Sequence, residues 1–270
     1  MLKQRIISGV IMAVLAIVLV ILMPNWIVVL VSAAIVMLAA WEWSRLTSQT
    51  DVLVKGLFMT VVAVCLVLSY VLRETWLGSV ISTLVFFAWV MISVGLWSYR
   101  QDDDTPPREQ TLLAAAAPLL LSAAFVAAVG LHQLSPAWLL YALTMTAVAD
   151  IGAYFVGKQF GEKKLSPHLS PGKTREGLFG GMLAVLIIAL FASLLLPVPG
   201  SSALSFILLS VLMSLVSVLG DLFFSMLKRE SGHKDSGNIL PGHGGVLDRL
   251  DSHIAVLPIF YAGLQWIQVV

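Results

Sequence analysis

Residues 203–227 read ALSFILLSVLMSLVSVLGDLFFSML, a stretch that contains a single charged residue, Asp221. A helix needs about 20 predominantly apolar residues to cross the hydrocarbon core of a bilayer, which is roughly 30 Å thick. The stretch meets that length, so we expect it to form a transmembrane helix.

The composition extends this expectation to the whole chain of 270 residues. Hydrophobic residues make up 59% of the chain and charged residues 11%, against about 25% charged in a typical soluble protein. A soluble fold cannot hide this much hydrocarbon, because even a chain of about 300 residues buries only about 75% of its unfolded surface. Soluble globular enzymes and disordered tails are therefore excluded. The net charge of +1 also provides no basic field for nucleic acid.

The same length criterion predicts nine membrane spans and an all-α, polytopic integral membrane protein. Proline-containing turns such as Pro24-Asn25, Ser135-Pro136 and the run 197–200 separate the apolar stretches. The expected spans are Ile6–Met23, Trp26–Trp43, Leu53–Leu72, Trp76–Trp97, Thr111–Leu131, Ala137–Gly157, Leu178–Leu196, Ala203–Leu227 and Asp251–Val270.

The distribution of lysine and arginine predicts the orientation. Short loops rich in these residues stay on the cytoplasmic side. If the amino terminus is cytoplasmic, inner segments carry 15 of the 16 lysines and arginines, and an outer loop carries only Arg73. We therefore expect an N-in, C-out topology.

Polar residues divide the chain into two parts. Residues 1–135 consist of spans with short connections, and we expect them to form a scaffold or dimerisation region. Glu42, between Trp41 and Trp43, is interpreted as an interfacial carboxylate in an aromatic belt. Residues 136–270 carry two polar cytoplasmic segments, 158–177 and 228–250, and are expected to form the catalytic region.

Each polar segment follows a span that contains a carboxylate, Asp150 in the first case and Asp221 in the second. At 1.5 Å per residue both lie about 10 Å below the cytoplasmic edge. A charge at that depth is costly unless it faces a polar cavity, a partner or a metal ion. An ion pair inside the membrane is the structural alternative. It is disfavoured because no lysine or arginine lies within the core of any span.

The segment 228–250 has the chemistry of a phosphate and metal site. Lys228, Arg229 and Lys234 suit a ligand with several phosphates, and glycines 242, 244 and 245 let a ligand approach backbone N–H donors. Asp248 and Asp251 are three residues apart at the expected start of the ninth helix, so they share one face. Carboxylates beside phosphate-binding cations are what Mg²⁺ requires.

The segment 158–177 suggests an anion site at a helix start. Ser170 is the expected N-cap and Pro171 the first helical residue of the seventh span. Lys173 and Thr174 would then lie in the first turn, where backbone N–H groups attract anions. The run Gly172-Lys173-Thr174 is not a P-loop, because Pro167 occupies the position of the required first glycine.

Taken together, these motifs resemble the signature of phosphatidate cytidylyltransferases, also called CDP-diacylglycerol synthases. The resemblance rests on Ser-x-x-Lys-Arg, Lys-Asp and Leu-Pro-x-His-Gly-Gly-x-x-Asp-Arg-x-Asp within residues 225–251, and on the stretches 150–158 and 165–177. It implies that CTP and phosphatidic acid give CDP-diacylglycerol and pyrophosphate, a step of phospholipid biosynthesis. It also implies a Mg²⁺-containing paired-cation centre, a cavity open to the cytoplasm, a homodimer and the bacterial inner membrane.

Roles for individual residues follow from the resemblance and from charge. Asp221 and Asp248 are the metal ligands that the family pattern implies, and Asp251 is a supporting or bridging carboxylate. The expected partners are CTP, phosphatidic acid and membrane lipids, with no nucleic acid. The catalytic candidates are Asp221, Asp248, Asp251, Lys228, Arg229, Lys234 and His243. The substrate-binding candidates are Asp150, Ser170, Lys173, Thr174, Ser225, Gly244, Gly245 and Arg249.

Two other interpretations stay open at this point. A CTP-dependent lipid kinase would use a similar nucleotide site but transfer the γ-phosphate and release CDP. A transporter would place its polar residues at the midplane of two inverted halves, whereas here they gather on one face of one half. His233 and His243 could each act as an acid or donor to pyrophosphate, or only hold the loop.

Overall fold

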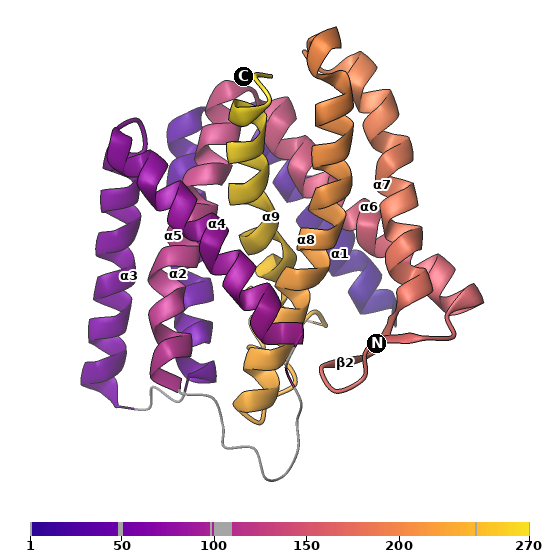
Figure 1. Ribbon diagram of the computed structural model, residues 1–270. Coiled ribbons are helices and arrows are strands. Elements are labelled where there is room, and N and C mark those ends of the chain that lie inside the picture. Colours follow the sequence, from indigo (N-terminus) through magenta and orange to yellow (C-terminus); the bar gives the residue numbers. More distant parts are fainter. Residues whose placement is uncertain (1, 48–50, 98, 100–109, 241, 270) are drawn as a thin grey trace.

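Nine α-helices form almost all of the described chain in the computed structural model (Figure 1). The structure describes residues 2–47, 51–97, 99, 110–240 and 242–269, with side chains from Ile7 onward except that of Gln110. The helices are α1 (Leu2–Leu22), α2 (Asn25–Leu46), α3 (Val52–Leu72), α4 (Trp76–Trp97), α5 (Gln110–Leu134), α6 (Pro136–Phe160), α7 (Arg175–Leu195), α8 (Ala203–Glu230) and α9 (Leu247–Trp266). A short 3-10 turn, Gly200–Ser202, precedes α8.

Helices occur at all nine expected positions within the described residues. Seven of them, α2 to α8, are long and apolar enough to cross a membrane. The described apolar part of α1 is shorter, Ile7–Leu22, and α9 begins with charged residues at 248, 249 and 251. Large apolar side chains are also exposed along the outer helices, for example Leu57 at 66% and Phe191 at 62%. Such surfaces require lipid, so the protein is a helical integral membrane protein.

The all-α expectation misses one element, a small hairpin between α6 and α7. Strands β1 (Lys164–Ser166) and β2 (Ser170–Thr174) pair antiparallel, with Lys164 opposite Thr174 and Ser166 opposite Ser170. The expected helix start at Ser170 is therefore wrong, and α7 begins at Arg175. Pairing with β1 holds the chain extended through Pro171, which overrides the capping signal of the Ser-Pro pair.

The hydrophobic core lies between α2, α5, α6, α8 and α9. Trp43 of α2 packs edge-on against Phe224 of α8, with ring centroids 5.0 Å apart. In a second cluster, Trp138 of α6 contacts Phe206 of α8 and Phe260 of α9. The two parts of the chain expected from sequence thus share one core. Their assignment as scaffold and catalytic region stays a prediction.

Helices α8 and α9 approach closely because Gly220 faces α9. A methyl group at Gly220 would lie 2.6 Å from the carbonyl oxygen of Asp251 and 3.0 Å from the Cβ atom of Ala255. Nearby, the Ser252 hydroxyl donates to the carbonyl oxygen of Ser217 at 3.1 Å. Small residues of this kind let membrane helices pack backbone against backbone. This contact brings Asp221 of α8 alongside Asp251 of α9.

We predict that Gly220→Ala lowers stability by about 1–3 kcal/mol, because the added methyl group overlaps backbone atoms that cannot move aside. The measurement is the midpoint of thermal unfolding in detergent. Gly56→Ala is the matched control, since nothing lies within 4 Å of a methyl group there. The control should be neutral or stabilising by about 0.5–1 kcal/mol. Equal midpoints for the two variants would contradict the close packing of α8 on α9.

Candidate active site

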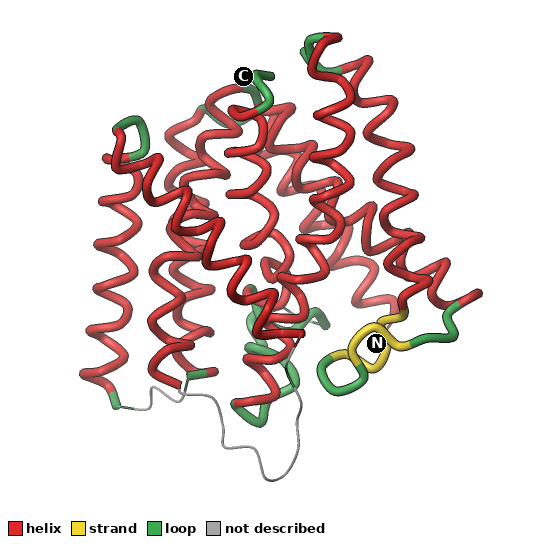
Figure 2. The backbone as a smooth tube through the Cα atoms, in the orientation of Figure 1, coloured by secondary structure: helices red, strands yellow, loops and turns green. Residues whose placement is uncertain are grey.

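The polar residues singled out in the sequence gather at one end of the bundle, which we call the polar end. It contains the carboxyl ends of α6 and α8, the β1–β2 hairpin, the loop 231–246 and the first turns of α7 and α9. It is the lower end in Figure 1, and Figure 2 shows the strands and this loop there. The carboxyl terminus of α9 lies at the opposite end (Figure 1).

The first charged group at the polar end is centred on Asp221. The Nζ atom of Lys173, in β2, lies 2.5 Å from its Oδ2 atom, and the Ser225 hydroxyl donates to its Oδ1 atom at 3.2 Å. Asp150 and Asp251 are close enough for their charges to repel that of Asp221. Asp221 therefore does form an ion pair, contrary to expectation, because the hairpin contributes a lysine from outside the span.

A cavity of about 310 Å³ opens beside this group. Asp150 and Lys173 face it, and α6, α7 and the hairpin form its walls. The exposed side chains of Tyr154 and Lys158 line its rim. The cavity therefore combines a cation, a carboxylate and an apolar boundary.

Thr174, not Ser170, caps α7. The Thr174 side-chain oxygen accepts a hydrogen bond from the backbone N–H of Gly177 at 3.1 Å, while Ser170 pairs with Ser166 in the hairpin. Lys173 consequently precedes the helix and does not lie in its first turn. A methyl group at Gly157 of α6 would lie 2.9 Å from the Thr174 hydroxyl oxygen, so this cap is packed against α6.

The second charged group is centred on Asp248, whose side chain is 6% exposed. Its Oδ1 atom accepts from Lys228 Nζ at 2.7 Å. Its Oδ2 atom lies within bonding distance of the Ser236 backbone N–H (2.8 Å), the Ser236 hydroxyl (3.0 Å) and the Gly245 backbone N–H (2.9 Å). The Lys228 charge and the backbone hydrogen bonds offset the cost of burying the Asp248 carboxylate.

Asp251 lies between the two groups. Besides repelling Asp221, its carboxylate interacts with the charges of both Lys173 and Lys228. Arg249 interacts in the same way with Asp150. The structure therefore brings together Asp150, Lys173, Asp221, Lys228, Asp248 and Asp251, together with Ser225, Arg249, Gly244 and Gly245.

Other candidates lie further from this centre. Arg229 and Lys234 are exposed. The His233 ring contacts the backbone carbonyl of Ser231 in its own turn at 2.7 Å, as expected for a residue that holds a loop. The His243 ring contacts the Ser8 hydroxyl of α1 at 2.9 Å. His243 is thus attached to the first helix of the chain.

The membrane-interface position expected for Glu42 of α2 is wrong. The residue is completely buried and faces the loop 231–246 instead of a membrane interface. Its carboxylate accepts hydrogen bonds from Ser236, Val246 and Leu247. Like Asp150 and Asp221, Glu42 is a carboxylate within an apolar span and needs partners. This signal in the sequence marks it as a candidate site residue.

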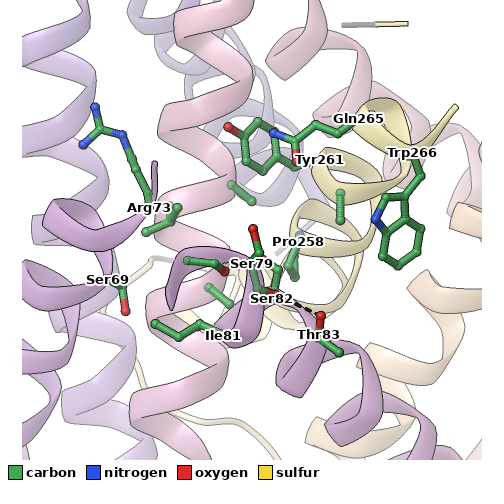
Figure 3. Close-up of a pocket in the computed structure, with 15 residues that line it drawn as sticks. Ser69, Arg73, Ser79, Ile81, Ser82, Thr83, Pro258, Tyr261, Gln265 and Trp266 are labelled. Atoms are coloured by element: carbon green, nitrogen blue, oxygen red, sulfur yellow. Dashed lines mark hydrogen bonds between the residues drawn. The ribbon is translucent and has the colours of Figure 1, made fainter. Parts of the chain in front are cut away.

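A second cavity, of about 140 Å³, lies near the opposite end (Figure 3). Two of its polar side chains bond to their own segments: Arg73 to Glu74 and the Tyr70 carbonyl, and Thr83 to the Ser79 carbonyl. It is also remote from the paired carboxylates and lysines. We therefore place the candidate active site at the polar end.

Fold and site together define a polytopic membrane protein with paired lysines and carboxylates at one end of a helical bundle. The family model "Cytidylyltransferase family" matches residues 3–267. A phosphatidate cytidylyltransferase of Pseudomonas aeruginosa is 38% identical over 98% of this chain and 97% of its own length. Two further phosphatidate cytidylyltransferases are similar to part of the chain. The one of Haemophilus influenzae is 50% identical over 45% of this chain and 43% of its own length, and the one of Bacillus subtilis is 44% identical over 51% of each chain. The chain belongs to the cytidylyltransferase family, is a nucleotidyltransferase enzyme, and the resemblance noted in the sequence is confirmed.

The two carboxylates should differ in what they contribute to stability. We predict that Asp248→Asn costs about 3–5 kcal/mol, because it removes one partner of a buried, hydrogen-bonded ion pair and leaves Lys228 without its counter-charge. Asp221→Asn should cost at most about 1 kcal/mol, since its ion pair is partly exposed and neutralisation relieves repulsion from Asp150 and Asp251. The measurement is the midpoint of thermal unfolding of each variant in detergent. We expect both variants to be folded at 25 °C. Equal unfolding midpoints would contradict these assignments.

Proposed function

We propose that the enzyme transfers the cytidylyl group of CTP to phosphatidic acid, releasing CDP-diacylglycerol and pyrophosphate. The single observation that carries the proposal is the 38% identity to a phosphatidate cytidylyltransferase over 98% of the chain. The paired lysines and carboxylates at the polar end support it, because both substrates are phosphates.

The proposed setting is the bacterial inner membrane, with the polar end facing the cytoplasm where CTP is present. The supporting observations are the bacterial relatives and the asymmetry of basic residues. In this arrangement all nine helices span the membrane, the amino terminus is inside and the carboxyl terminus is outside. A homodimer is the proposed assembly, on the strength of the family resemblance alone.

The reaction joins two anions. A phosphate oxygen of phosphatidic acid attacks the α-phosphorus of CTP, and the bond from that phosphorus to the bridging oxygen breaks as pyrophosphate leaves. A phosphate monoester has a second pKa of about 6, so it is mostly ionised at neutral pH and needs no strong base. The barrier is therefore repulsion and alignment, which cations and rigid positioning reduce.

Residues of the two charged groups divide this work in our proposal. Lys173, with the cavity beside Asp150, binds the lipid phosphate, since Tyr154 and Leu178 give that cavity an apolar border. Lys228 and Arg249, with Arg229 and Lys234 further out, neutralise the triphosphate. The backbone N–H groups of the glycine-rich loop provide neutral donors. Existing ion pairs hold the two lysines in place before either substrate arrives.

Mg²⁺ is the proposed cofactor, held by Asp221 and Asp248. Within the described residues no group of three His, Cys, Asp or Glu side chains surrounds a common position. Mg²⁺ does not need one, because one or two carboxylates, substrate phosphates and water usually complete its shell. The donor set fits on this ground, because Asp221 and Asp248 supply carboxylate oxygens beside two lysines, Lys173 and Lys228, that can bind the phosphates of the substrates. When bound, the ion supplies charge neutralisation at the triphosphate.

The position of a radiolabel tests the proposal against a CTP-dependent lipid kinase. Purified protein receives phosphatidic acid, Mg²⁺ and CTP labelled in either the α- or the γ-phosphate. Label from the α position should enter the lipid fraction and γ label should leave as pyrophosphate. Lipid labelled from the γ position alone would reject the cytidylyltransferase and favour the kinase.

Asp221→Asn tests the site within the same assay. We predict a fall in turnover of about 100-fold or more, as for the loss of one electrostatic group at a reacting phosphate, with stability little changed. Asp51→Asn is the control, because Asp51 only caps α3 through the backbone N–H groups of Leu53 and Val54. Turnover near the wild-type value in Asp221→Asn would exclude Asp221 from the site.

A further inference from the structure

Glu42 supplies a charge to a helix that has no cap of its own. Val246, the residue that precedes α9, provides no side-chain hydrogen bond to the helix start. The first N–H groups of a helix need acceptors and attract negative charge. The Oε1 atom of Glu42 accepts from the Val246 N–H at 3.0 Å, and the Oε2 atom accepts from the Leu247 N–H at 2.8 Å. A carboxylate of α2 thus caps α9.

Four residues of the loop 231–246 surround the same carboxylate, namely Ser236, Gly237, Gly245 and Val246. A side chain at Gly237 would overlap the Oε1 atom of Glu42, and one at Gly245 would overlap the Oε2 atom and the Ser236 hydroxyl. The Glu42 side chain has no exposed surface. Because an isolated buried carboxylate is costly, the loop and Glu42 stabilise each other, and neither can shift alone.

Ser236 and Gly245 connect Glu42 to Asp248. The Ser236 hydroxyl lies 2.8 Å from Oε2 of Glu42 and 3.0 Å from Oδ2 of Asp248. Its single proton can go to only one of these carboxylates at a time. The backbone N–H groups of Ser236 and Gly245 hold Asp248 in either case. Glu42 holds the loop that carries these N–H groups, so the position of Asp248, and through it that of Lys228, depends on Glu42.

We propose that Glu42 is a positioning residue that sets the geometry of Asp248, Lys228 and the glycine-rich loop for cytidylyl transfer. The part of this proposal that concerns the rate of cytidylyl transfer rests on the proposed function. Glu42 acts through backbone N–H groups and Ser236, and it lies in the part of the chain that sequence analysis assigned to scaffolding. In this proposal, the second helix contributes a residue that the site at the polar end requires.

Hydrogen exchange of Glu42→Gln tests the anchor without any assay of activity. The amide has the shape of the carboxylate, but its NH₂ group must face an N–H donor of Val246 or Leu247. We expect exchange in peptides covering 236–247 to accelerate about tenfold or more, with the hairpin 164–174 unchanged. Glu176→Gln is the matched control, because the Glu176 carboxylate accepts from the N–H groups of Glu162 and Lys163 at 3.1 and 3.2 Å. Both bonds go to the Oε2 atom, so the amide oxygen of glutamine can accept them, and exchange at 236–247 should stay unchanged.

Unchanged exchange at 236–247 in Glu42→Gln would overturn the proposal. Faster exchange in every helix would also overturn it, because a positioning residue leaves the bundle intact. Glu42→Asp keeps the charge but is one methylene shorter, and we expect a smaller acceleration confined to the same peptides. Global loosening or no change in both variants would reject the anchor.

Steady-state kinetics then separate positioning from mere support of the loop. We expect kcat of Glu42→Gln to fall about tenfold or more, with KM for phosphatidic acid unchanged, because Lys173 lies on the hairpin. Glu42→Asp should recover part of kcat. Local loosening with wild-type kcat would overturn the catalytic part of the proposal. If the wild type itself shows no cytidylyl transfer, the proposed function fails, and the exchange pattern still decides whether Glu42 anchors the loop.

Discussion

A carboxylate inside an apolar helical bundle must find cations or hydrogen-bond donors, because an unpaired charge in such surroundings costs several kcal/mol. The polar end is arranged around this constraint. Glu42 and Asp248 collect backbone N–H groups from the loop 231–246, while Asp221 and Asp248 each hold a lysine. Without these partners the ends of α2, α8 and α9 could not pack as closely as they do.

The same constraint gives the site its chemical character. The buried Asp248 and the partly exposed Asp221 each hold a lysine in place, and Asp248 and Glu42 also hold the glycine-rich loop through its N–H groups. Gly244, with φ of +83°, adopts a left-handed conformation within this loop, and a side chain there would approach Oδ2 of Asp248 at 2.8 Å. Rigid cations and donors suit a reaction between two phosphates, in which positioning and charge neutralisation provide most of the rate enhancement.

Composition and the length of the apolar stretches were sufficient for the helices, because a span must be apolar along its whole length to be stable in lipid. The depth of Asp150 and Asp221 likewise marked them as candidates, and the structure places both beside Lys173 at the polar end. The hairpin was missed because Ser170-Pro171 has the local signature of a helix start, and only pairing with residues 164–166 reveals a strand. The Lys173–Asp221 contact depends on that hairpin and was missed with it.

Glu42 was misjudged for a similar reason. Its neighbours Trp41 and Trp43 suggest a membrane interface, yet Trp43 is buried against Phe224 and the partners of Glu42 lie about two hundred residues further along the chain. No local pattern contains that information.

The central claim is that one site is formed between the Lys173–Asp221 pair and the Lys228–Asp248 pair. The most direct measurement is an experimental structure of the protein with CTP and Mg²⁺. The account predicts density for the triphosphate and the metal ion between these two pairs, beside the loop 231–246. A nucleotide bound elsewhere, with both pairs unchanged and distant from its phosphates, would contradict it.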